Sequence, residues 1–218
     1  MSLRRITLAL FALVVLAALV PSDARAAGAP RGSLSRIRPR IVADTHVQAV
    51  DDRFEPTVPQ VPRGGTVVFD FVGPINHHAA ADSLLGLYDS GSVAAGGPST
   101  SYTFVAAGIY PFTCVFHILE GMTGRIHVPM QAAPAKGSLQ RRFTITWASA
   151  SAQAGFVYDV RLKRPGRPWM LWRSGIKVPT NAFRPHAGTG GYRFAARLRR
   201  SDTDAASLWS DDVSIAVG

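Results

Sequence analysis

The sequence predicts an all-β chain of two β-sandwiches that follow one another. Segments rich in β-branched and aromatic residues, such as 66–72 and 156–162, alternate with turns rich in Gly and Pro. No amphipathic repeat with the period of a helix continues for more than about ten residues. Residues 44–133 carry eight acids and three bases, whereas residues 134–218 carry five acids and fourteen bases. The net charge therefore changes from −5 to +9 along the chain, which indicates two domains.

The first 26 residues have the pattern of an export signal. Arg4 and Arg5 precede an almost wholly apolar segment over residues 6–20, and residues 24–26 read Ala-Arg-Ala, as at a cleavage site. The apolar segment is shorter than the roughly 20 residues that a membrane-spanning helix needs. We therefore expect cleavage near Ala26, no transmembrane span in the mature chain, and a secreted, periplasmic or cell-envelope location.

Composition divides the rest of the chain. Residues 27–43 are rich in Ala, Arg, Pro and Gly, which predicts a basic flexible leader. Residues 131–138 have a similar character and predict a flexible linker. The first domain would then span residues 44–130 and the second residues 139–218.

Strands of the first domain are predicted at three places. Residues 66–72 follow a Gly-rich turn and mix β-branched with aromatic side chains. Residues 101–105 and 109–116, separated by a break at Ala107 and Gly108, indicate a hairpin. The segment before them contains prolines, which suit edge or loop positions: Pro56, Pro59 and Pro62.

The only cysteine of the chain, Cys114, stands three residues before His117 and eight before Met122. Exported proteins usually pair their thiols in disulfides, and this thiol has no partner in its own chain. A thiolate, an imidazole and a thioether on one loop suit copper better than calcium, magnesium or manganese. A type-1 copper site needs a second histidine, and His77 and His78 are the candidates because they follow a predicted strand.

Residues 44–130 resemble the cupredoxins, small blue-copper proteins, and among them the plastocyanin type. The resemblance implies a Greek-key β-sandwich that binds one type-1 copper ion and transfers electrons by the Cu(I)/Cu(II) couple. It rests on residues that occur in the family's order over the whole domain: Val50, Asp51, Asp52, Phe54, Pro56, Val61, Gly64, Val67, His77, His78, Phe104, Ala107, Gly108, Tyr110, Phe112, Cys114, His117, Met122, Gly124 and Ile126.

The resemblance favours His78 over His77 as the second histidine ligand. Relatives commonly read His, three small or β-branched residues and Asp, before a later Asp-Ser-Gly, and Asp82 and Asp89 stand at these places. His77 stays open as the alternative. Plastocyanins usually follow this histidine with Asn, whose side chain bonds to the cysteine loop, whereas the next residue here is Ala79. The implied copper ligands are His78, Cys114, His117 and Met122.

The sequence argues against an enzyme. Multicopper oxidases and copper nitrite reductases need additional histidines, such as His-x-His pairs, and the chain contains no such pair. A complete ligand set favours outer-sphere electron transfer to a redox partner protein, with the ring edge of His117 as the exit. The alternative function is copper handling or envelope attachment without redox traffic.

Structural roles are the alternative for several of these residues. Cys114 and Met122 could fill the core as small or flexible apolar side chains. The other histidines are expected to be ordinary surface or core residues: His46, His127 and His186. Five apolar residues are expected in the core, with a docking patch around His117 as the alternative: Leu84, Leu85, Leu87, Ile118 and Leu119.

Residues 138–217 resemble a fibronectin type III module, an immunoglobulin-like β-sandwich. Alternating strands contain an early Trp147 and a late Tyr192, and the end reads Trp209-Ser210. No catalytic constellation and no nucleic-acid motif occurs in this domain, and the protein is expected to be a monomer. Its basic residues indicate a solvated face or a surface for an anionic cell-envelope polymer: Arg161, Lys163, Arg164, Arg167, Arg197, Arg199 and Arg200.

Overall fold

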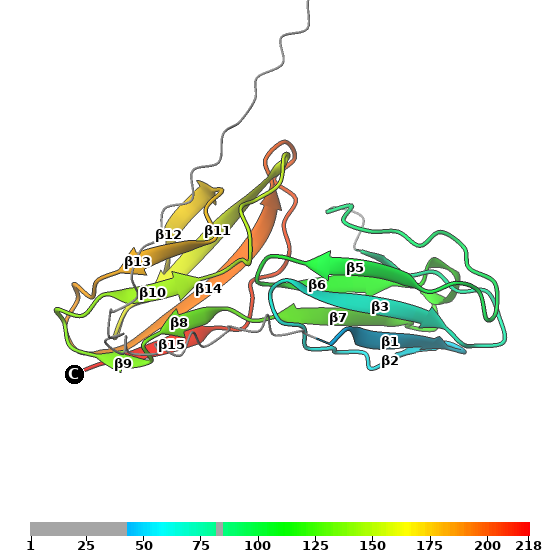
Figure 1. Cartoon of the computed structure of the whole chain (residues 1–218), viewed down its shortest axis with the longest axis horizontal. Helices are drawn as coiled ribbons and strands as arrows, with labels where there is room; N and C mark the ends of the chain where they lie inside the picture. The colour runs from blue at the N-terminus through cyan, green and yellow to red at the C-terminus, as the bar shows by residue number, and fades with distance from the viewer. Residues whose placement is uncertain (1–42, 82–84) are drawn as a thin grey trace, which may run out of the picture. The chain divides into compact units, whose positions relative to one another are not determined.

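The computed structural model describes residues 43–81 and 85–218, and this part of the chain is all-β (Figure 1). The predicted signal peptide, nearly all of the leader, and Asp82 and Leu84 lie outside the described residues. Four sheets form two sandwiches, which confirms the predicted fold class. The only helical element in the described residues is a 3₁₀ turn, η1, at Val115–His117. This part contains no helix with the length and apolarity that a membrane crossing requires.

The first sandwich contains a four-stranded and a three-stranded sheet. The four-stranded sheet has the order β2-β1-β3-β5, with strands Arg53–Glu55, Thr45–Val50, Gly65–Phe71 and Thr100–Phe104. The three-stranded sheet has the order β4-β6-β7, with strands Ala80–Ala81, Gly108–Thr113 and Thr123–Val128. The predicted hairpin is therefore wrong, because β5 and β6 belong to different sheets and the break between them carries the chain from one sheet to the other.

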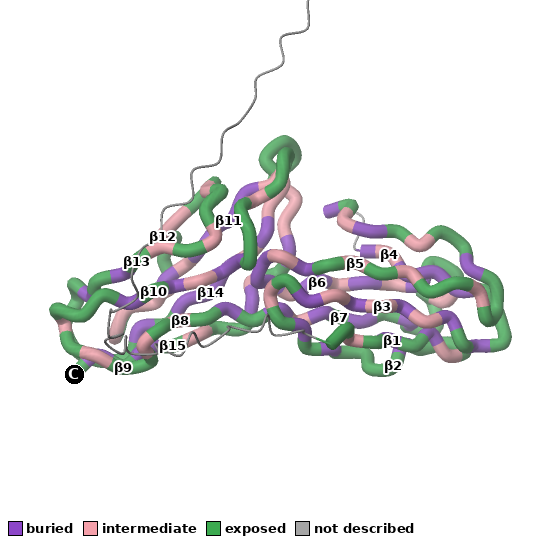
Figure 2. Tube along the Cα trace, viewed as in Figure 1, coloured by how far each residue is buried: buried purple, intermediate pink, exposed green. Residues whose placement is uncertain are grey.

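Alternation along β3 and β6 builds the core of the first sandwich. Phe69 and Phe71 in β3, and Tyr110 and Phe112 in β6, are buried, whereas their neighbours along each strand are half-buried. The rings of Phe69 and Phe112 pack edge to face with centroids 5.3 Å apart, which joins the two sheets. Figure 2 shows the buried positions along these strands. This packing fixes the end of β6, where the chain enters the loop at Cys114.

The second sandwich also contains two sheets. The three-stranded sheet has the order β13-β10-β8, with strands Thr180–Phe183, Phe143–Thr146 and Gln131–Ala133. The five-stranded sheet has the order β12-β11-β14-β15-β9, with strands Trp169–Ile176, Phe156–Lys163, Gly190–Arg200, Val213–Val217 and Lys136–Gly137.

The structure corrects the predicted flexible linker at residues 131–138. β8 pairs antiparallel with β10, and β9 pairs parallel with β15, so this segment supplies an edge strand to each sheet of the second sandwich. Backbone hydrogen bonding outweighs the local composition, because small residues such as Ala fit an edge strand as well as a loop.

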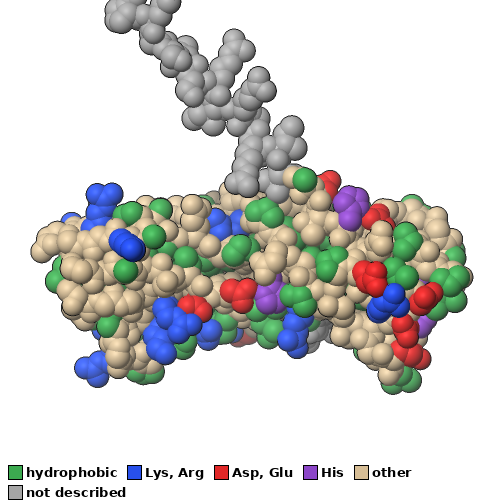
Figure 3. Space-filling model, turned by 90° about the horizontal axis from the view of Figure 1, so that it is seen from below, with side chains coloured by type: hydrophobic (Ala, Val, Ile, Leu, Met, Phe, Trp, Pro, Cys, Tyr) green, Lys and Arg blue, Asp and Glu red, His purple; other side chains and the backbone are tan. Residues whose placement is uncertain are grey.

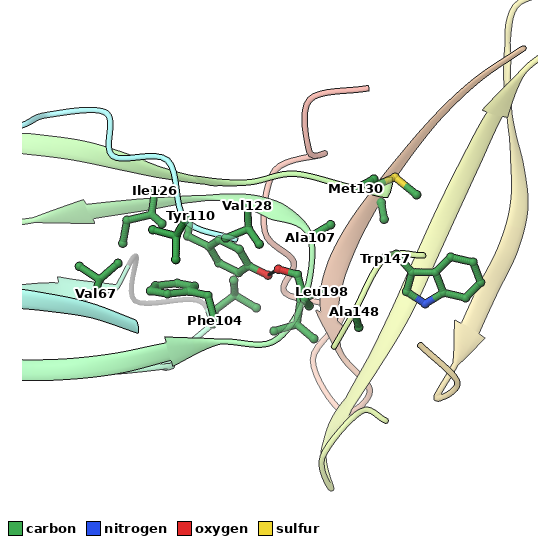
Figure 4. Packing of buried hydrophobic residues seen from close by; sticks show 14 of the residues in the cluster. Val67, Phe104, Ala107, Tyr110, Ile126, Val128, Met130, Trp147, Ala148 and Leu198 are labelled. Carbon is green, nitrogen blue, oxygen red and sulfur yellow. Dashed lines mark hydrogen bonds between the residues drawn. The ribbon is translucent and has the colours of Figure 1, made fainter. Parts of the chain in front are cut away.

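Backbone hydrogen bonds also join the two sandwiches. Ile109 and Leu208 exchange two of them, with N–O distances of 3.1 and 3.0 Å, and the amide of Ala107 donates to the carbonyl of Trp147 at 2.7 Å. A single hydrophobic cluster includes buried residues of both sandwiches, such as Tyr110 and Trp147 (Figure 4). The two sandwiches therefore lie in the same compact unit of the described chain.

Candidate metal centre

The loop from Cys114 to Met122 is closed by backbone hydrogen bonds. The amide of Cys114 donates to the carbonyl of Met122, and the amide of Met122 donates to the carbonyl of His117, each at 3.0 Å. The amide of His117 donates in turn to the carbonyl of Cys114 at 3.3 Å. Gly121 has a φ of +84°, which glycine adopts without strain, and the chain turns back there toward β7. These contacts fix Cys114 and His117 relative to each other.

Backbone pairing also decides which histidine faces this loop. His77 and Val93 exchange two backbone hydrogen bonds of 2.9 Å, and two residues later the carbonyl of Ala79 accepts one from the amide of Ser90 at 3.1 Å. Successive side chains of an extended segment point to opposite sides. His77 and His78 therefore point to different sides, and it is the ring of His77 that lies beside Cys114 and His117.

Donor atoms of His77, Cys114 and His117 lie within 4.8 Å of one another. The Sγ atom of Cys114 is 3.4 Å from Nδ1 of His117, and the ring centroids of His77 and His117 are 5.3 Å apart. His77 and Cys114 are fully buried, whereas His117 is half-buried. Within residues 43–81 and 85–218, no other group of three His, Cys, Asp or Glu side chains converges in this way.

The chemistry of these residues fits a copper ion. Neither ring nitrogen of the buried His77 has a hydrogen-bond partner within the described structure. A buried polar group without a partner costs about 1–3 kcal/mol, and a bound metal would remove part of that cost. Burial, and then the neighbouring His117, lowers the pKa of His77, which favours the neutral imidazole that binds metals. A thiolate with two imidazoles is the equatorial donor set of type-1 copper.

The structure corrects the preference for His78. The Nε2 atom of His78 lies 2.7 Å from Oδ1 of Asp89, and its ring packs edge-on against Phe116 with centroids 6.3 Å apart. His78 is therefore not part of the cluster, and His77, the alternative, occupies the predicted place. The preference rested on Asp82, four residues after His78. Such a spacing does not fix the direction of either ring, because a shift of one residue in register exchanges the two directions. The residue that follows the clustered histidine is therefore His78 and not Ala79. Like Ala79, His78 differs from the Asn that plastocyanins usually have at this place.

Met122 is buried at the base of the same loop. Its side chain is 1% exposed, and its backbone is hydrogen-bonded to both Cys114 and His117. This placement is compatible with an axial thioether, and that role stays a prediction.

The apolar residues that were expected together in the core differ in their burial. Leu85 is buried and Leu87 packs against the core, whereas Ile118 and Leu119 are 53% and 96% exposed. The other histidines make hydrogen bonds away from the cluster: His46 with Asp70, His127 with Asp211, and His186 with the carbonyl of Arg184.

Gly73 is a residue of the site that sequence reasoning missed. A side-chain carbon added at Gly73 would lie 2.5 Å from Nε2 of His77 and 2.7 Å from the amide nitrogen of Asp51, closer than such contacts occur in proteins. The ring of His77 therefore packs directly on the backbone of Gly73. A glycine just after the strand 66–72 and four residues before His77 was the only signal in the sequence.

Comparison with solved structures finds similarity to a plastocyanin, a purple cupredoxin and an amicyanin. Plastocyanin from Dryopteris crassirhizoma is 24% identical with a TM-score of 0.36, and the match covers 39% of this chain and 100% of that one. A purple cupredoxin from Nitrosopumilus maritimus is 19% identical with a TM-score of 0.35 and the same coverage. A single-residue variant of amicyanin in its reduced state is 24% identical with a TM-score of 0.34, over 41% of this chain and 87% of its own. No protein-family model and no curated protein matches the sequence.

Proposed function

We propose that this chain is a mononuclear type-1 copper protein that carries electrons outside the cytoplasm. The observation that supports the proposal is the convergence of His77, Cys114 and His117, with both nitrogens of His77 lacking any other partner within the described structure. These three residues would hold the ion, with Met122 as the axial ligand. Bound copper would supply a one-electron Cu(I)/Cu(II) couple.

In this function the protein fixes the positions of the donor atoms and keeps water away from them. The pairing of His77 with Val93 and the bonds across the base of the loop 114–122 fix the two donor-bearing segments. A preorganised site has little to rearrange when its charge changes. Complete burial of Cys114 keeps water and oxidants away from the sulfur.

His117 offers the route for the electron. Of the three donor residues it alone is partly exposed, and the side chains around it on the loop are exposed and apolar: Val115, Phe116, Ile118 and Leu119. An exposed apolar patch of this kind indicates a protein contact site. In this proposal a redox partner docks there, and the electron passes at the ring edge of His117.

Addition of Cu(II) to the purified protein tests the proposal. We expect an intense visible absorption band, and we expect Cys114→Ser to abolish this band while the far-ultraviolet circular dichroism stays unchanged. The band should bleach with a mild reductant and return on reoxidation, and electron self-exchange between oxidised and reduced protein should be fast.

Three outcomes would count against this function. A band that survives Cys114→Ser would exclude the thiolate as a ligand. Copper binding without an intense band would exclude a type-1 site. An intense band with slow self-exchange would favour the alternative function, copper handling without redox traffic.

A further inference from the structure

Ion pairs occupy part of the basic surface of the second sandwich. Within the described residues, four arginines of β14 pair with four carboxylates: Arg193 with Asp212, Arg197 with Asp159, Arg199 with Asp159 and Asp204, and Arg200 with Asp202. Three of these arginines belong to the surface that the sequence indicated for an anionic polymer. Because their charge is already balanced, that surface must be sought elsewhere.

Bases without a carboxylate partner gather at one end of the second sandwich. Strand pairing brings the loops 138–142, 164–168 and 184–189 together there. Phe143 pairs with Phe183, so the first and third loops adjoin. A side-chain carbon added at Gly190 would lie 3.1 Å from Pro165, so the second loop adjoins the third. Six bases in or beside these loops form no ion pair within the described part of the chain: Arg141, Arg142, Lys163, Arg164, Arg167 and Arg184.

No acidic residue offsets this charge nearby in the sequence. Residues 134–158 and 160–201 contain neither Asp nor Glu. On the face seen in Figure 3, Lys and Arg side chains lie over the second sandwich, and most of the visible acidic side chains lie over the first. The loop end therefore attracts anions, and salt should weaken that attraction.

The basic surface at this end of the second sandwich contains a hollow. It has a volume of about 500 Å³, and it is lined by Arg164, Pro165, Arg167, Pro168, Met170 and Ala187. Arg164 and Arg167 flank the tip of the β11–β12 hairpin, whose turn is closed by a hydrogen bond from the amide of Arg167 to the carbonyl of Arg164. The Nε atom of Arg164 is buried and has no hydrogen-bond partner among the described residues. Two arginines thus line one hollow.

We propose that these three loops bind an anionic polysaccharide, with a carboxylate of the polymer held by Arg164 and Arg167. A guanidinium group matches a carboxylate with two parallel hydrogen bonds. Pro165, Pro168 and Met170 supply apolar surface against which the face of a sugar ring packs. The additional bases of the loops extend the positive surface along the polymer. This binding is independent of the copper site and would attach an electron carrier to the cell envelope.

Binding of the copper-loaded full chain to immobilised alginate, a polymer of uronic acids, tests the proposal. We expect retention at low salt and release at high salt. Arg164→Gln combined with Arg167→Gln should raise the dissociation constant for alginate by about tenfold or more, which is the effect of losing about one charge-assisted hydrogen bond. Neither residue is in an ion pair, so the fold should persist, and an unchanged visible band would confirm this.

A matched control removes the same charge elsewhere. Arg125→Gln combined with Lys177→Gln changes one exposed base in the first sandwich and one at the far end of β12, and should alter alginate binding by less than about twofold. Equal weakening by the two double variants would overturn the proposal, because net charge alone would then explain retention. Binding to DNA-cellulose as tight as to alginate, or no binding to alginate at low salt, would overturn it as well.

Discussion

In the first sandwich His77 is fully buried and neither ring nitrogen has a hydrogen-bond partner among the described residues, whereas Asp159 in the second sandwich is equally buried and fully bonded. Ser174 and the amide of Gly175 donate to Oδ1 of Asp159, each at 3.0 Å. Arg197 and Arg199 donate to Oδ2 at 3.0 and 2.9 Å.

The difference separates a structural polar group from a functional one. A buried carboxylate whose partners are all supplied by the protein stabilises the fold and has no capacity left for a ligand. A buried imidazole without a partner costs stability in the metal-free protein, and this cost is recovered when a metal binds. His77 therefore keeps both nitrogens open for a ligand beside Cys114 and His117, whereas Asp159 belongs to the scaffold.

Replacement of the two adjacent histidines gives the largest expected effect. His77→Ala should abolish the copper band and weaken copper binding by more than about 100-fold, because it removes a ligand rather than a supporting contact. His78→Ala removes the bond to Asp89 and the ring contact with Phe116 but no donor of the cluster, and it should keep the band, with affinity within about tenfold of the parent. Copper titration followed by visible absorption measures both. The reverse pattern would restore the original preference for His78.

Asp159→Ala should act on stability and not on copper. Loss of the buried carboxylate leaves Arg197 without an acidic partner and Arg199 with Asp204 alone. Breaking a fully buried ion pair costs about 3–5 kcal/mol. The lower end applies because both guanidinium groups keep some contact with water. Urea unfolding measures the loss, and the copper band at low temperature should be that of the parent. A weaker copper band in the folded Asp159→Ala variant would contradict the conclusion that Asp159 serves the scaffold and not the copper site.

Acid should remove the same contribution from the unchanged protein. Burial by itself would raise the pKa of Asp159, but hydrogen bonds led by those of Arg199 and Gly175 outweigh it and lower the pKa. The stabilisation is therefore complete above the unfolded pKa of about 4 and is lost as the pH falls through the lower folded value. The difference in unfolding free energy between the parent and Asp159→Asn should shrink from pH 6 to pH 3. A difference that stays constant would mean that this carboxylate does not titrate in that range.

Gly73→Ala tests whether the close contact between Gly73 and the ring of His77 matters for the site. The added carbon would press on Nε2 of His77, so we expect a loss of about 1–3 kcal/mol together with weaker copper binding and a shifted visible band. Gly191→Ala is the control, because no atom lies within 4 Å of its added carbon, and it should change stability by less than about 1 kcal/mol. A stability loss with an unchanged band would limit Gly73 to packing.

Replacement of Met122 should give the smallest effect, a shift in the reduction potential of the copper ion. Met122→Leu should raise the reduction potential and Met122→Gln should lower it, because the axial ligand sets the potential of a type-1 site. Both variants should keep the blue band, and cyclic voltammetry measures the shift. Unchanged potentials in both variants would show that the thioether does not face the metal.

Much of the first domain could be predicted from local patterns. The strand at residues 66–72 appears as β3 because β-branched and aromatic side chains fit a pleated, half-buried surface. The loop from Cys114 to Met122 was found because its donor types stand close together in the chain. The hairpin and the linker were wrong because strand pairing is made by distant segments, as when β8 pairs with β10.

The sequence by itself determined the all-β class, the order of the donor residues along the chain, and the change of charge between its halves. Each follows from composition or short spacing, which folding cannot alter. Only the tertiary structure decided that His77 rather than His78 faces Cys114, because the direction of a side chain in an extended segment depends on its register with Val93, 16 residues away. It also decided which arginines remain free, since Asp159 reaches Arg197 and Arg199 only after β11 and β14 have paired.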